Sequence, residues 1–107
     1  MDDLGQLCEE HLTRARADPH GRSAHRVLHQ GPLRQTVIAL TAGSALDEHN
    51  APIAASVQAL RGSVALTTSD GDQTLRQGEI HAVPQTRHGL RALEDAVVLL
   101  TAVTAVG

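Results

Sequence analysis

The chain contains no phenylalanine, tyrosine or tryptophan, and this absence limits both how it folds and what it binds. Hydrophobic residues still make up 41% of its 107 positions, so the core must be built from aliphatic side chains. Without aromatic rings the chain has no platform for stacking bases, no aromatic cage for an ammonium group and no aromatic membrane girdle. A chain of this length forms one domain with one core, in which folding buries about 65% of the surface.

Lysine is also absent, and the nine arginines are outnumbered by twelve acidic residues. With a net charge of −3 the chain lacks the positive charge that binds a phosphate backbone, so we expect no nucleic-acid partner. No apolar run is long enough to cross a bilayer, so we expect no membrane partner. The first residues are acidic and polar, unlike those of a secretory signal. These features predict a cytoplasmic protein.

Cys8 is the single cysteine, which excludes an internal disulfide and any CxxC zinc or redox motif. It belongs to an apolar stripe at helical spacing within residues 2–18, where acidic residues come first and arginines last. The members of the stripe are Leu4, Leu7, Cys8, His11, Leu12 and Ala15. The pattern predicts a short amphipathic helix that is ended by Pro19 and Gly21.

After the helix the apolar pattern changes to short stretches separated by turn residues, which is typical of β-strands. The predicted strands cover residues 24–29, 34–41, 55–60, 63–68, 73–76, 79–83, 88–93 and 96–104. Evenly spaced strands predict an all-β sandwich or barrel. We expect residues 1–21 to form the helix and turn, and residues 22–107 to form a single barrel domain. The last predicted strand is apolar on both faces, so we expect it to be central or covered by a second subunit.

A segment bounded by glycines resembles the first motif of the cupin superfamily. That motif runs Gly, five residues, His-x-His, three or four residues, Glu, six residues, Gly. Here Gly43, His49 and Gly62 stand at matching positions. Ala51 and Ala55 occupy the positions of the second His and the Glu, so two of the three ligands of this motif are replaced.

A second segment resembles the other cupin motif, which runs Gly, five residues, Pro and a short turn that ends in His. Gly78, Pro84 and His88 match it, and Ala92 stands where an Asn often follows. The resemblance implies a cupin double-stranded β-helix, a jelly-roll-like barrel of the small single-domain RmlC-like kind. It does not imply one activity, because this superfamily hosts dioxygenases, isomerases, decarboxylases, storage proteins and ligand sensors.

The resemblance also implies a site in which three His nitrogens and one carboxylate hold a first-row divalent metal. This chain offers His49 and His88, and Asp47 is the better candidate for a third ligand because it shares the strand parity of His49. Such a site would hold one ion of Zn, Ni, Mn or Fe. The alternative is a metal-free pocket in which the two imidazoles bind a small ligand or act as general acid or base.

Other polar residues are candidates for the same pocket. Gln58 and His81 are candidate ligand-binding residues, and the alternative for His81 is a half-exposed position on its strand. His25 and His29 are four residues apart, a spacing that keeps both on one face of a regular strand. We expect them, together with His11 and His20, to be surface residues.

Three functions follow from these residues. The first is a small-ligand-binding cupin without assignable chemistry. The second is a metal-dependent cupin enzyme, of the dioxygenase or isomerase type, that uses His49 and His88. The third is a regulatory or interaction module whose N-terminal helix docks on a partner. The resemblance and the need to cover edge strands predict a homodimer.

Overall fold

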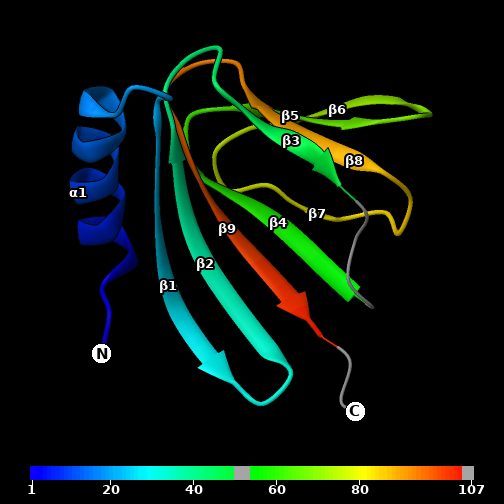
Figure 1. Ribbon diagram of the computed structural model, residues 1–107, viewed down its shortest axis with the longest axis horizontal. Coiled ribbons are helices and arrows are strands. Elements are labelled where there is room, and N and C mark those ends of the chain that lie inside the picture. Colours follow the sequence, from blue (N-terminus) through cyan, green and yellow to red (C-terminus); the bar gives the residue numbers. More distant parts are fainter. Residues whose placement is uncertain (50–53, 105–107) are drawn as a thin grey trace.

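The computed structural model describes residues 1–49 and 54–104, without the side chains of residues 47–49. Two antiparallel sheets pack face to face, and one helix lies outside the larger sheet (Figure 1). The elements are α1 (Leu4–Ala17), β1 (Arg22–Gln30), β2 (Leu33–Leu40), β3 (Ala45–His49), β4 (Ala54–Arg61), β5 (Val64–Thr68), β6 (Gly71–Leu75), β7 (Ile80–Ala82), β8 (His88–Ala92) and β9 (Ala96–Val103). The sheet orders are β1-β2-β9-β4-β7 and β3-β8-β5-β6. The mostly-β fold with an N-terminal helix is confirmed.

Helix α1 forms where the apolar stripe predicts it. Asp3 caps its first turn, because the carboxylate accepts a hydrogen bond from the backbone N–H of Gln6 at 3.1 Å. Arg14 and Arg16 lie in the last turn, where they complement the negative end of the helix dipole. The buried stripe packs on the outer face of the five-stranded sheet. The buried apolar members of this contact are Leu7, Cys8, Ala15, Val37, Ala39 and Val97.

The main core lies between the two sheets and is aliphatic throughout. Alternation along the central strands decides which residues enter it: in β9, Val98 faces the opposite sheet and Val97 faces the helix. Strand β9 lies between β2 and β4, so both of its edges are paired, and its two faces are covered by the helix and by the opposite sheet. Its doubly apolar sequence is therefore explained by a central position, as predicted, without a second subunit.

Strand β3 is the element that the sequence pattern missed. Its residues, Ala45–His49, contain little apolar alternation, so the strand is hard to distinguish from a polar loop. In the structure it is an edge strand that pairs only with β8 within the described residues. This segment is therefore a strand because it pairs with β8, and the local sequence pattern does not reveal that pairing.

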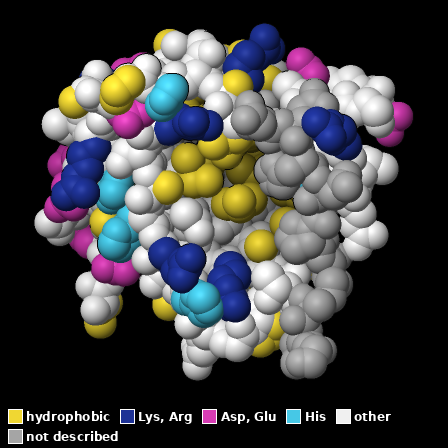
Figure 2. Space-filling view, viewed as in Figure 1, with side chains coloured by type: hydrophobic (Ala, Val, Ile, Leu, Met, Phe, Trp, Pro, Cys, Tyr) yellow, Lys and Arg dark blue, Asp and Glu magenta, His cyan; other side chains and the backbone are white. Residues whose placement is uncertain are grey.

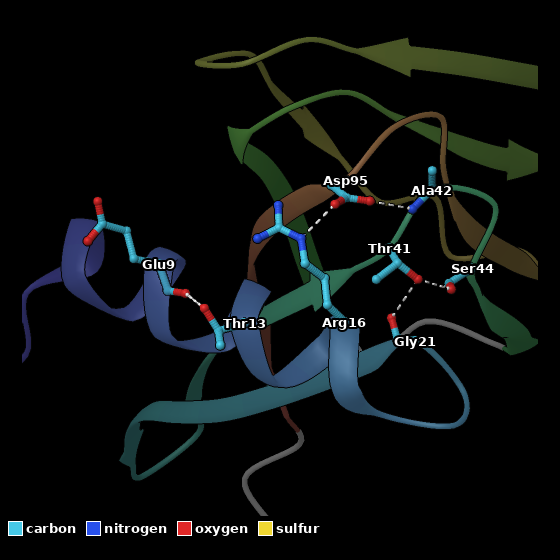
Figure 3. Close-up of polar contacts among 8 residues, drawn as sticks. All are labelled: Glu9, Thr13, Arg16, Gly21, Thr41, Ala42, Ser44 and Asp95. Atoms are coloured by element: carbon cyan, nitrogen blue, oxygen red, sulfur yellow. Dashed lines mark hydrogen bonds and ion pairs between the residues drawn. The ribbon is translucent and has the colours of Figure 1, made fainter.

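A polar link joins the helix to the turn that precedes β9 (Figure 3). Arg16 donates from Nε to Asp95 Oδ2 at 2.9 Å, and the backbone N–H of Ala42 donates to Asp95 Oδ1 at the same distance. The hydrogen bond from Ala42, followed by that from Arg16, lowers the pKa of Asp95 below its usual range. One carboxylate therefore holds the end of the helix, the β2–β3 turn and the β8–β9 turn together.

Gly62 is required by both conformation and space. Its φ is +66°, in the left-handed region that favours glycine. A Cβ at this position would collide with the backbone carbonyl oxygen of Asp95. The turn from β4 into β5 therefore depends on the glycine that closes the first motif.

Candidate functional site

A cavity opens between the two sheets and is lined almost entirely by aliphatic side chains. With its open mouth it contains about 350 Å³ of space between atoms, of which about 30 Å³ can hold the centre of a water-sized molecule. Residues such as Ile38, Val57, Leu66 and Leu100 form its walls, and His88 is the one polar side chain in its described lining. Figure 2 shows hydrophobic side chains at the floor of a hollow in the middle of this face, with arginine side chains along its border. The cavity is an apolar pocket with one imidazole in its wall.

His88 is the first residue of β8, and only 6% of its surface is exposed. Its Nδ1 lies 3.1 Å from the backbone carbonyl oxygen of Thr86. A carbonyl oxygen only accepts hydrogen bonds, so the ring donates through Nδ1. In the neutral ring the lone pair is then on Nε2, and that nitrogen is the one suited to accept a proton or bind a metal.

The sheet register places His49 and His88 next to each other. Their Cα atoms are direct partners across β3 and β8, although β3 is irregular between Leu46 and His49. On its other side His88 is paired with Thr68 of β5. The side chains of His49 and of Asp47 lie outside the described residues, so the joint site of these residues stays a prediction.

The structure places Gln58 and His81 outside the cavity lining. Gln58 alternates along β4 with Val57 and Ala59, which are buried between the sheets, so Gln58 lies on the opposite face. His81 is exposed on the edge strand β7, and its Nδ1 lies 2.6 Å from the carbonyl oxygen of Ala82. Of the four predicted ligand-binding residues, His88 alone is seen in the described lining.

A cluster that the sequence did not predict lies at the β1–β2 hairpin, and we call Arg26, His29 and Arg34 the hairpin cluster. Arg26 Nη1 lies 2.6 Å from His29 Nδ1, and Arg34 is the register partner of His29. A β-bulge between Arg26 and Leu28 shifts the register, so residues three apart share one face. Charge on Arg34, desolvation and charge on Arg26 lower the pKa of His29, in that order.

The same bulge separates two histidines that the sequence placed together. His25 pairs with Val37, which faces the helix, whereas His29 pairs with Arg34, which shares the parity of Ile38 on the inner face. The expectation that His25 and His29 share a face is therefore wrong. A regular strand would have kept them together, and the extra residue moves His29 to the other side.

The described residues do not make a metal centre. No group of three or more His, Cys, Asp or Glu side chains among them is arranged to hold a metal ion. Ala55, at the position of the motif carboxylate, packs against the core and has no donor atom. A cupin-type metal would therefore depend on His49 and Asp47, whose side chains are outside the described part.

The sequence matches no protein-family model and no curated protein, but the fold matches solved structures. TT1209 from Thermus thermophilus is similar with a TM-score of 0.76 at 24% identity, covering 98% of this chain and 98% of that chain. A cupin-2 domain containing protein from Shewanella frigidimarina gives a TM-score of 0.74 at 12% identity, covering 96% and 94%. An RmlC-like cupin from Desulfovibrio desulfuricans gives 0.69 at 23% identity, covering 77% and 81%.

The chain therefore has the cupin fold. More narrowly, it has the small single-domain, RmlC-like form of that fold, as the two glycine-bounded motifs predicted. In the described part of the chain, the only helix is too short and too polar to cross a membrane.

Proposed function

We propose that this protein binds a small ligand in the cavity between the sheets, with His88 as the polar anchor and His49 as its neighbour. The observation that carries the proposal is that the described wall of the cavity is aliphatic except for one imidazole, that of His88. Ligand sites are commonly apolar clefts with a few polar groups that fix orientation. The space within the cavity that the centre of a water-sized molecule can occupy is about 30 Å³, which favours a ligand of few heavy atoms.

The hydrogen bond to Thr86 defines what the imidazole of His88 offers. With Nδ1 donating to that carbonyl, a neutral ring presents Nε2 as an acceptor for a ligand hydroxyl or amide. A protonated ring presents Nε2–H as a donor to a ligand carboxylate or carbonyl. The Cα register supports the inclusion of His49, since direct cross-strand partners are neighbours on a sheet.

The same register favours a second candidate function. His49 and His88 are the two residues that match ligand positions of the cupin motifs, and their backbones are adjacent. A metal-dependent enzyme of the dioxygenase or isomerase type would use them with Asp47 to hold one divalent ion of Zn, Ni, Mn or Fe. In that case the chain would supply fewer protein ligands than the full motif provides.

The regulatory alternative required an exposed apolar face on the helix. Leu7 is buried, and Leu4 and Leu12 pack against the cluster between α1 and the five-stranded sheet. The apolar stripe of the helix is therefore covered by its own domain. We do not adopt a docking function for it.

Titration of the isotopically labelled chain with isobutanol, followed by amide NMR shifts, tests the ligand proposal. We expect shifts at Gly89, Leu90 and Leu100 in the wild type and weaker binding by His88→Ala. His81→Ala is the matched control, because His81 is exposed and away from the lining. The proposal fails if the shifts lie elsewhere, or if His88→Ala binds as the wild type does.

Elemental analysis of untagged protein, purified without added metal, separates the two candidates. Near one metal atom per chain in the wild type, with loss in both His49→Ala and His88→Ala, supports the metal-dependent enzyme. Metal near zero in all three proteins favours the metal-free pocket. Metal that persists in both variants contradicts a site built on these two residues.

A further inference from the structure

We propose that the hairpin cluster of Arg26, His29 and Arg34 is a carboxylate-binding rim at the cavity mouth. The ligand class would then be a short aliphatic carboxylate, with its chain in the cavity and its charge at the rim. The inference rests on the proposed function and names the chemistry that the cavity selects.

Register places Arg26 on the same row of the sheet as the cavity wall. Arg26 pairs with Thr36, Thr36 pairs with Leu100, and Leu100 pairs with Val57. Direct partners across antiparallel strands point to the same side of a sheet. Leu100 and Val57 both line the cavity, so Arg26 shares their face at the β1 edge.

Arg34 lies further toward the hairpin on that face. It has the parity of Thr36 and Ile38 along β2, and Ile38 lines the cavity. His29 is its direct partner on β1. The inner face of the β1–β2 hairpin thus changes from aliphatic at Ile38 to cationic at Arg34, over one strand.

Neither guanidinium is neutralised by a carboxylate within the described residues. Arg16 and Arg91 form ion pairs with Asp95 and Asp72, whereas Arg26 and Arg34 have none. Both side chains form their hydrogen bonds with neutral groups. Arg26 contacts Nδ1 of His29, and Arg34 donates to the carbonyl oxygens of Gly31 and Leu33.

These contacts orient the side chains without using all of their donors. A guanidinium has five N–H donors in a planar fork that matches a carboxylate. Arg34 is half-buried, so an ion pair at this residue is less screened by solvent than one at a fully exposed arginine. An apolar interior with a cationic rim is complementary to an anion with a short hydrocarbon chain.

Comparison of 3-methylbutanoate with its neutral analogue 3-methylbutanamide tests the inference on the full chain, by NMR titration. We expect the carboxylate to bind more tightly than the amide, and Arg34→Gln to weaken carboxylate binding about tenfold while leaving amide binding unchanged. Arg26→Gln should act in the same direction. Arg91→Gln is the matched control, because Arg91 lies on the outer face of β8 and pairs with Asp72.

A second measurement needs no variant. Added sodium chloride should weaken binding of 3-methylbutanoate by the wild type and leave that of the amide unchanged, because salt screens the ion pair. Equal binding of the two probes in the cavity overturns the inference and leaves the proposed function standing. Unchanged carboxylate binding by Arg34→Gln and Arg26→Gln overturns it as well. If isobutanol enters the cavity but neither 3-methylbutanoate nor 3-methylbutanamide does, the carboxylate-binding rim is rejected and the proposed ligand site is not.

Discussion

The imidazole of His11 on helix α1 is hydrogen-bonded to Ser23 of β1, with 2.7 Å between Nδ1 and Oγ. The expectation that His11 is a surface residue is wrong: it is 3% exposed, because it lies on the face of the helix that packs on the sheet. Its ring lies 5.4 Å from that of His25. The helix therefore docks on the sheet through a buried titratable group. Burial lowers the pKa of His11, and the nearby charges of Arg14 and His25 act in the same direction, against a smaller opposing effect of Glu10.

This contact predicts a loss of stability in mild acid. A histidine whose pKa is lowered by folding binds its proton more readily in the unfolded chain. Its stabilising contribution is complete above the unfolded value, near 6.5, and is lost as the pH falls below it toward the folded value. We expect the free energy of unfolding to fall in this window by less than roughly 1 kcal/mol per pH unit for one proton. Urea unfolding at a series of pH values measures it.

Two variants identify the group responsible for this slope. His11→Gln should flatten the dependence, whether or not it lowers stability overall. His29→Gln is the comparison, because the pKa of His29 is also lowered, chiefly by Arg34, at an exposed position. His25 Nε2 lies 3.9 Å from Asp2 Oδ2, and its ring is the one beside that of His11. An unchanged slope in His11→Gln would contradict the assignment.

Replacement of Gly62 by alanine should be strongly destabilising. Alanine would have to adopt the left-handed backbone conformation of this position, and its Cβ would meet the carbonyl oxygen of Asp95. We therefore expect the free energy of unfolding to fall by about 2–4 kcal/mol. Gly31→Ala is the control, because Gly31 also has a positive φ but has open space around it. Its loss should be about 1 kcal/mol. Equal losses in thermal or urea unfolding would show that the contact with Asp95 has no effect.

Asp95→Ala should also reduce the stability, by about 1 kcal/mol. The variant removes the acceptor for the N–H of Ala42 and the partner of Arg16. Asp72→Ala is the control: its ion pair with Arg91 is 3.7 Å long and exposed, and we expect a change near zero. Similar urea midpoints for the two variants would contradict the structural role of Asp95.

We also expect the protein to be a homodimer in solution. Strand β9 no longer supports this expectation, since the helix and the second sheet cover it. The remaining physical reason is the open edges of strands such as β1 and β7, which offer unpaired backbone groups to another chain. Light scattering at micromolar concentration should give twice the mass of one chain. A monomer mass would contradict the prediction.

The sequence predicted the fold well because its strongest signals are local or carried by motifs. The stripe of α1 and the strand around Val57 follow simple periodicity, and the strand around Val98 is a continuous apolar run. The spacing from Gly78 to His88 led to the cupin resemblance. Strand β3 was missed because its polar residues become a strand only through pairing with β8. Pairing of this kind is a tertiary effect and leaves little trace in local sequence.

The site was predictable only in part. His88, which the motif singled out, lies in the cavity lining, whereas Gln58 lies outside that lining because its face depends on which neighbours enter the core. The hairpin cluster was missed for a different reason. A bulge at Val27 brings Arg26 and His29 to one face, and nothing in the residues around Val27 signals the extra position.

The central place of β9 has a consequence for how the chain is made. Strand β9 separates β2 from β4 in the finished sheet, although it is synthesised after all the other described strands. Until β9 is made, the five-stranded sheet lacks its central strand. The contact with the helix then lacks Val97, and the core between the sheets lacks Val98. The domain therefore cannot close until β9 has been synthesised, and its apolar surfaces stay exposed until then.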